Sequence, residues 1–173
     1  NKMEFSFGDE VKDGPMSLGM HKRGSFYDVV TTDECHIVHP DFCKILVCTK
    51  EYFEEKKVGF YKKMQHTGYL RHLLVRRAVK TGEILVALVT SGQTENLGAT
   101  EEYTTPVSEQ ELLAGWLSCM QALELEGTFA GILHIRNDTL ADVVQSDETR
   151  ILYGQDFFYE ELLGLKFRIT PFS

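Results

Sequence analysis

Two segments rich in leucine and valine, residues 70–79 and 83–90, place the strongest constraint on the fold of this chain. The short stretch Lys80-Thr81-Gly82 joins them, and its length and composition are typical of a β-hairpin turn. The second segment holds the longest uninterrupted apolar run, from Ile84 to Val89, whereas a membrane-spanning helix needs about 20 such residues. The sequence therefore predicts a buried antiparallel hairpin in a globular domain that has no membrane partner.

Two amphipathic helices are predicted on either side of this hairpin. One opens at residues 39–41, His-Pro-Asp, because proline suits the first turn of a helix; its apolar positions recur with helical spacing up to Phe53. The other follows Ser108, which has Glu111 three residues later, as in a capping box. We expect this second helix to end at Gly127.

Shorter strand patterns complete the expected elements. They lie at residues 3–7, 15–20, 25–30, 129–136 and 150–154, and a final hairpin is expected around Gly164. Strands outnumber helices and the connections are mainly hairpins, so the predicted class is α+β, a largely antiparallel β-sheet with two main helices packed on it. The length of 173 residues fits one domain, and strand patterns at both ends suggest a part of a larger protein.

Charge is distributed unevenly along the chain. The formal net charge is −8, yet residues 1–80 carry 14 Lys and Arg against 11 Asp and Glu, whereas residues 81–173 carry 4 against 15. Local patches rather than total charge attract charged ligands. The acidic average therefore does not exclude a nucleic-acid surface in the first half of the chain.

The basic residues of that half lie close to aromatic residues, a combination that suits RNA. His21, Lys22 and Arg23 shortly precede Phe26 and Tyr27 at a predicted turn. Lysine and arginine neutralise phosphates, and aromatic rings stack on unpaired bases. Any one of these residues alone is more typical of a solvated charged face. As a group they predict a phosphate-facing surface made of Lys2, His21, Lys22, Arg23, Arg71 and Arg76.

Motifs for nucleotide binding or hydrolysis are absent from the sequence. Neither Gly14-x4-Gly19 nor Gly19-x4-Gly24 continues with the Lys and Ser/Thr of a P-loop, and no GxGxxG, GxSxG or HExxH occurs. The sequence therefore gives no support to a nucleotide-binding or zinc-protease function.

The four cysteines include no CxxC pair, which excludes a local zinc ribbon. Cys43, Cys48 and Cys119 are interpreted as small buried residues. The remaining one, Cys35, forms a compact group of soft ligands with His36 and His39. Three ligands fall short of a structural zinc site, but they leave a metal-binding enzyme open as an alternative.

Two separated segments resemble the RNA (uracil-5-)-methyltransferases, which make 5-methyluridine in 23S ribosomal RNA and transfer RNA. The first comprises residues 1–8, NKMEFSFG, and residues 18–30, LGMHKRGSFYDVV; the second is the tail GLKFRITPFS, residues 164–173. The resemblance follows the whole chain in the right order and is weaker over residues 40–130.

This resemblance implies that residues 1–173 are the central domain of a larger methyltransferase, between an N-terminal RNA-binding module and a C-terminal S-adenosylmethionine domain. The catalytic cysteine and the methyl-donor site belong to that C-terminal domain. We therefore expect no catalytic or cofactor-binding residues and no cofactor in this chain, which should be inactive alone. A scaffold or docking domain that touches RNA little is the alternative.

The resemblance also assigns partners and one metal ligand. Cys35 matches the last of four cysteines that bind a 4Fe-4S cluster in some members, although His36 departs from the proline common there, and the other three cysteines are missing here. The expected partners are RNA, ribosomal in preference to transfer RNA, and the flanking domains of the same protein, in the cytoplasm.

Overall fold

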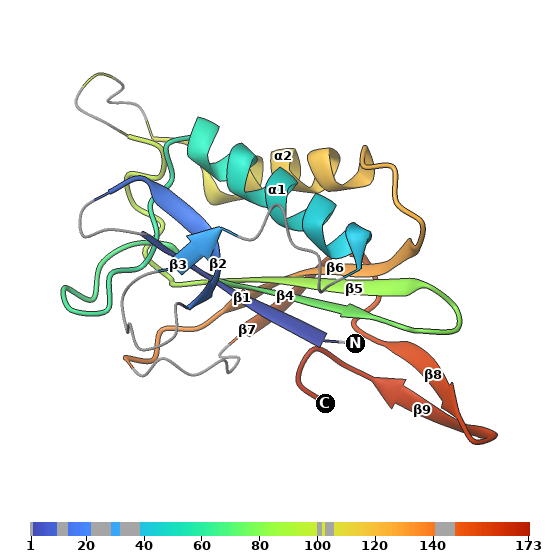
Figure 1. The fold of residues 1–173 in the computed structure, drawn as a ribbon. Coiled ribbons are helices and arrows are strands. Elements are labelled where there is room, and N and C mark those ends of the chain that lie inside the picture. The colour runs from blue at the N-terminus through green and yellow to red at the C-terminus, as the bar shows by residue number, and fades with distance from the viewer. Residues whose placement is uncertain are drawn as a thin grey trace.

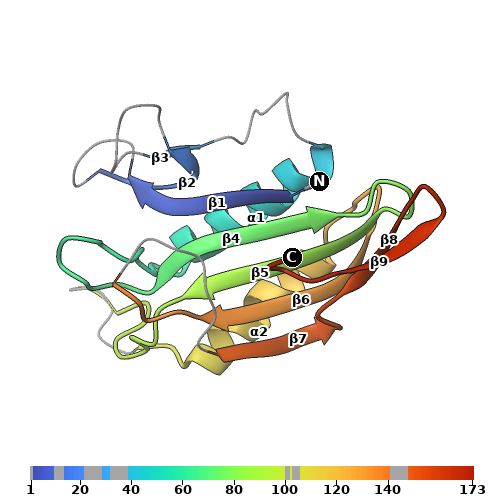
Figure 2. The same ribbon diagram turned by 90° about the horizontal axis from the view of Figure 1, so that it is seen from below.

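The computed structural model of the chain describes residues 2–9, 14–21, 29–31, 39–99, 102, 106–140 and 148–173, with the backbone alone at residues 20, 21 and 29–31. Two helices lie on one face of a seven-stranded sheet, and a separate two-stranded hairpin lies at the opposite side (Figures 1 and 2). The elements are β1 (Lys2–Asp9), β2 (Met16–His21), β3 (Val29–Thr31), α1 (Pro40–Glu55), β4 (Leu70–Arg77), β5 (Glu83–Thr90), α2 (Glu109–Gln121), β6 (Thr128–Arg136), β7 (Glu148–Gly154), β8 (Phe158–Leu162) and β9 (Leu165–Ile169).

The strand order of the large sheet is β3-β2-β1-β4-β5-β6-β7. The predicted hairpin is confirmed as β4 and β5, which pair antiparallel with Leu73 opposite Leu88 and Val75 opposite Val86. β5 and β6 instead run parallel, an arrangement that needs a crossover connection, and α2 supplies it. The connection from β5 to β6 is therefore not a hairpin.

α1 forms where its sequence predicts it. Pro40 is its first residue, and the ring Nδ1 of His39 accepts a hydrogen bond from the backbone N–H of Asp41 at 3.1 Å, which caps the helix. The apolar residues that recur with helical spacing, Phe42 and Phe53 among them, are buried against the sheet. The amphipathic pattern therefore determined both the position of this helix and the face that it buries.

α2 begins as predicted and ends earlier. Ser108 caps it by accepting a hydrogen bond from the backbone N–H of Glu111 at 3.2 Å. The helix stops at Gln121 rather than at Gly127. The carboxylate of Asp41 binds the backbone N–H groups of residues 126 and 127. A helix that continued to Gly127 would use these groups internally, so the contact with Asp41 excludes the predicted end.

The core lies on both faces of the sheet. On the helix face, Trp116 packs against Phe53 and donates a hydrogen bond from Nε1 to Thr49 Oγ1 at 3.1 Å. The smaller core on the other face, which includes Leu74 and Leu133, is covered in part by Phe158 at the base of the β8–β9 hairpin. The predicted α+β class, with two helices on a largely antiparallel sheet, is confirmed.

No helix within the described ranges is long and apolar enough to cross a membrane.

Candidate nucleic-acid interface

Three of the six residues predicted to contact RNA lie near one end of the sheet. Lys2 opens β1 and is exposed, and its Cα partner on β4 is Arg76, so both side chains leave the same face. The last residue of β2 is His21, two positions beyond Gly19, which pairs with Ser6 of β1. The backbone of β2 therefore ends beside the first half of β1, close to Lys2.

Arg76 is bound within the protein. Its Nη1 donates hydrogen bonds to the carbonyl oxygens of Thr170, at 2.9 Å, and of Ser173. The side chain is half-buried, and this burial lowers the pKa of its guanidinium. A phosphate would have to compete with these carbonyl groups, so Lys2 is the more accessible cation of the pair.

Arg71 lies in the interior, with 4% of its surface exposed. Its Nη1 donates to the carbonyl oxygens of Asn137 at 2.9 Å and Thr139 at 2.7 Å, and the guanidinium stacks 4.2 Å above the ring of Tyr61. This arginine holds the loop after β6 against the start of β4. The guanidinium of Arg71 is therefore inaccessible to RNA, and we do not assign it to the RNA surface.

The remaining predicted site residues lie outside the described part of the chain. These are Lys22 and Arg23 of the predicted RNA surface, and Cys35 and His36 of the predicted metal ligands. Their assignments stay predictions.

A second basic surface lies in the connector between α1 and β4, residues 56–67. Lys56, Lys57 and Lys62 are exposed and Lys63 is half-buried, and the connector contains no acidic residue. A hydrogen bond from the backbone N–H of His66 to the carbonyl oxygen of Lys62, at 2.8 Å, closes a compact turn. The connector lies at the opposite end of β4 from Arg76 (Figure 2). The predicted RNA surface does not include these lysines.

Sequence reasoning missed a charged network between the start of α2 and the sheet. Glu109 Oε1 accepts hydrogen bonds from Arg136 Nη2 at 3.1 Å and Arg150 Nη1 at 3.4 Å, and its Oε2 accepts one from the hydroxyl of Tyr69 at 2.8 Å. Burial, followed by the charge of Glu109, raises the pKa of Tyr69. These residues are far apart in sequence, so no local pattern signalled the network. It ties the N-terminus of α2 to β6 and β7.

His134 lies beneath the same network and is 1% exposed. Its Nε2 is 2.7 Å from Thr90 Oγ1, and its Nδ1 is buried without a hydrogen-bond partner. Burial lowers the pKa of the imidazole to about 4; the Glu109 charge opposes this shift, and the Arg150 and Arg136 charges add to it. His134 is therefore a neutral interior residue at physiological pH.

His39, one of the residues of the metal alternative, is used for structure. Its Nδ1 caps α1, and its Nε2 lies 2.9 Å from Glu126 Oε2. Asp41 lies within reach of both, but its Oδ1 and Oδ2 accept the backbone N–H groups of Glu126 and Gly127 at 2.9 and 2.8 Å. The donor atoms already have partners within the protein. This cluster is therefore better explained as a set of contacts that hold α1 against the segment before β6 than as a metal site.

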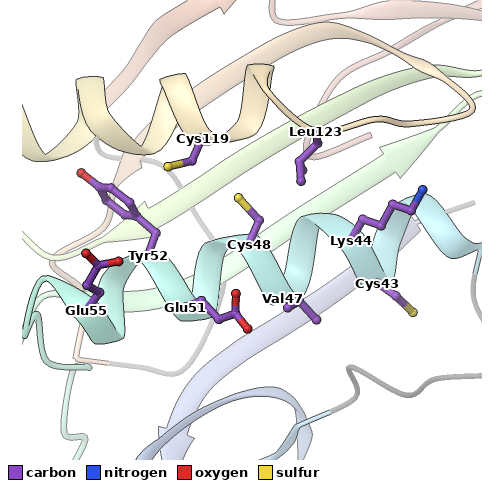
Figure 3. Close-up of a pocket in the computed structure, with 9 residues that line it drawn as sticks. All are labelled: Cys43, Lys44, Val47, Cys48, Glu51, Tyr52, Glu55, Cys119 and Leu123. Carbon is purple, nitrogen blue, oxygen red and sulfur yellow. The ribbon is translucent and has the colours of Figure 1, made fainter.

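A cavity of about 550 Å³ opens between the two helices and is lined in part by cysteine side chains (Figure 3). Cys48 of α1 and Cys119 of α2 are free thiols that point into it, and both are half-buried rather than fully buried as expected. Burial raises the pKa of Cys48 to about 11, and the nearby Cys119 adds to this effect. At neutral pH the Cys48 thiol is protonated, so it is a poor nucleophile and a poor metal ligand.

The described cysteines do not match an iron–sulfur site. Such a cluster needs a set of cysteine thiolates, whereas Cys48 and Cys119 line a cavity in which burial raises the pKa of the Cys48 thiol. In the part of the chain that the structure describes, the one group with metal-binding geometry contains no cysteine. No cluster chemistry can be derived from these residues.

Comparison with known proteins gives a consistent result along the whole chain. Proteins named as uncharacterized RNA methyltransferases match over all of it: one from Clostridium tetani at 46% identity, one from Clostridium acetobutylicum at 45%, and one from Caldanaerobacter subterraneus subsp. tengcongensis at 41%. The chain spans 35% of the length of each. No protein-family model matches the sequence.

A solved structure supports the fold. The crystal structure of Pyrococcus abyssi tRNA (uracil-54, C5)-methyltransferase in complex with S-adenosyl-L-homocysteine superimposes with a TM-score of 0.66 at 22% identity. It covers 99% of this chain, which corresponds to 35% of that protein. The predicted resemblance to RNA methyltransferases is confirmed. The whole chain matches about one third of the length of each of these relatives.

Proposed function

We propose that this chain is the RNA-engaging central part of an S-adenosylmethionine-dependent RNA methyltransferase that modifies C5 of uridine. The observation that carries the proposal is the similarity of the whole chain to proteins named RNA methyltransferases, at identities up to 46%. The protein with the similar fold, a tRNA (uracil-54, C5)-methyltransferase in complex with S-adenosyl-L-homocysteine, supports the chemistry and the methyl donor.

The proposal divides the work between this chain and the rest of the full-length protein. Residues 1–173 form the central domain, and the catalytic residues and the methyl-donor site lie in the part that the relatives carry beyond it. The chain alone is therefore inactive. Of the two RNA classes, we propose 23S ribosomal RNA as the substrate. The experiment below tests transfer RNA as the alternative.

The proposed RNA surface starts from Lys2 and the end of β2. Lys2 is exposed, and β2 ends at His21, directly before Lys22 and Arg23. The exposed lysines of the connector, Lys56, Lys57 and Lys62, are a second candidate surface at the other end of β4. Cationic contacts to phosphate release counterions, so affinity at either surface falls as salt rises.

Binding of 23S and transfer-RNA fragments to the chain, measured by fluorescence anisotropy over a salt series, tests this surface. The double variant Lys22→Ala/Arg23→Ala should weaken binding and flatten its salt dependence. The matched control is Lys44→Ala/Lys50→Ala on α1, which removes the same charge from the helix side of the molecule. This variant should change RNA affinity little. Salt-independent binding, or equal loss in both double variants, would contradict the assignment.

The activity is tested on the full-length protein with S-adenosylmethionine labelled in its methyl group. Mass spectrometry of the digested RNA should find 5-methyluridine in 23S RNA, and the 173-residue chain alone should transfer no methyl group. A product methylated at another atom, or modification of transfer RNA alone, would refute the corresponding part of the proposal.

Cys35 enters the proposal as one of four ligands of a 4Fe-4S cluster in the full-length protein. The support is its matching position in the sequence resemblance. Iron and sulfide analysis of anaerobically purified full-length protein tests this, and Cys35→Ser should lower the iron content. Full-length protein without iron would contradict the assignment.

One observation favours the second candidate function, a scaffold domain with little RNA contact. Two of the predicted RNA ligands, Arg71 and Arg76, donate to carbonyl oxygens of the protein itself. If the scaffold function holds, the full-length protein should bind RNA equally well with and without Lys22→Ala/Arg23→Ala.

A further inference from the structure

The β8–β9 hairpin exposes apolar side chains at its tip. Leu163 is 92% exposed, Leu165 61% and Leu162 60%. The hairpin projects away from the helices at the border of the molecule (Figure 1). Contiguous apolar side chains of this size are uncommon on a free surface and mark sites of interaction.

The tip also uses a backbone conformation that disfavours leucine. Leu163 and Gly164 form the two-residue turn, with φ of 53° and 77°. A turn with positive φ at both central residues favours Asn-Gly, because asparagine and glycine tolerate the left-handed region and bulky side chains do not. Leucine at this position thus serves neither the turn nor solubility, which points to a contact made by its side chain.

The base of the hairpin is held firmly. Phe158 is buried in the core on the open face of the sheet, and Ile169 packs against the same core. Glu160 accepts a hydrogen bond from the backbone N–H of Val79 at 3.1 Å. A fixed base with an apolar tip presents the leucines in one orientation.

The charges of the hairpin identify the kind of partner. Glu160 and Glu161 on β8 balance Lys166 and Arg168 on β9, and Glu161 lies directly opposite Lys166. The hairpin therefore carries no excess of positive charge and no separate basic patch for phosphate groups or an anionic lipid surface. The exposed leucines instead match a concave apolar surface of a protein.

We propose that the tip of the β8–β9 hairpin, Leu162 to Leu165, docks into an apolar pocket of the remaining part of the full-length methyltransferase. The relatives carry about two thirds of their length beyond the matched region, since the chain spans 35% of each, so an intramolecular partner of sufficient size is available. This inference rests on the proposed function only in taking the chain as one part of a longer protein. The hairpin then fixes the orientation of the RNA-engaging domain relative to that part.

Hydrogen–deuterium exchange of the chain alone and of the full-length protein tests the docking directly. The amides of residues 162–165 should exchange rapidly in the chain and slow by about tenfold or more in the full-length protein. Equal exchange in both would overturn the proposal, and so would a dimer of the chain alone, seen by analytical ultracentrifugation, that protects the same amides.

The variant Leu163→Asn separates docking from hairpin folding. Asparagine suits the turn, so the melting temperature of the chain alone should stay equal or rise. In the full-length protein the same variant should lose the protection at residues 162–165 and lower the melting temperature. Leu140→Asn, which removes another exposed leucine outside the hairpin, is the control and should leave that protection unchanged. A protected hairpin in a protein that methylates no RNA would refute the proposed function and leave the docking intact.

Discussion

Acidification should weaken the fold through one residue, His134. This imidazole is buried between the sheet and α2, with one ring nitrogen near Thr90 Oγ1 and the other without a partner. Protonation would place a positive charge beside the guanidinium groups of Arg136 and Arg150, with Glu109 and Glu148 as the only opposing charges among the groups that influence its pKa. The fold therefore holds His134 neutral and resists its protonation.

The magnitude follows from the pKa of His134, which is about 4 in the folded chain and about 6.5 for an unperturbed histidine. Because the unfolded chain takes up the proton first, this contribution to stability is complete above a pH of about 6.5 and is lost as the pH falls toward 4. A difference of about 2.5 pKa units limits the loss to about 3 kcal/mol, of which about 2 kcal/mol should disappear between pH 7 and pH 5.

Urea unfolding followed by the fluorescence of Trp116, the only tryptophan of the chain, measures this loss. His134→Gln removes the titrating group but keeps a polar atom for Thr90. Between pH 7 and pH 5 its free energy of unfolding should therefore fall by about 2 kcal/mol less than that of the wild type. Carboxylates titrate in both proteins and cancel in the comparison. Parallel pH profiles for the wild type and His134→Gln would refute the reasoning.

Three further predictions concern two buried residues and one half-buried cysteine. Asp41→Ala should lower the free energy of unfolding by roughly 2–4 kcal/mol, because two backbone N–H groups lose a charged acceptor; Glu126→Ala, at an exposed carboxylate, should cost far less in the same urea titration. Arg71→Ala should lower the free energy of unfolding by roughly 2 kcal/mol while RNA affinity changes by less than about twofold; a large loss of affinity in the folded variant would return Arg71 to the RNA surface. Cys48 should react with iodoacetamide at pH 8 roughly a hundredfold more slowly in the folded than in the urea-unfolded chain, as read by mass spectrometry, because burial raises the pKa of its thiol from 9.0 to about 11; equal rates would show that the thiol is not desolvated.

The candidate site was predictable in its composition and less so in its geometry. The excess of basic residues before residue 80 placed the predicted RNA surface in that part of the chain. Arg71 and Arg76 lie five residues apart on one strand and look equivalent in sequence. The register shift between Leu70 and His72 changes the alternation of side chains at Arg71, and the loop after β6 covers it. Exposure depended on partners more than sixty residues away.

The sequence by itself determined the local features: the start of α1 at Pro40, the cap of α2 at Ser108, the β4–β5 hairpin and the resemblance to RNA methyltransferases. The three structural features depend on side-chain periodicity and on short-range signals, which a sequence displays directly, and the resemblance depends on matching segments of sequence. Only the tertiary structure decided the parallel pairing of β5 with β6 and the end of α2 at Gln121. It alone also decided the charged network around Glu109. Each of these results from groups that meet only after the chain has folded, and the free energy that selects them comes from burial and charge pairing between distant segments rather than from local preference.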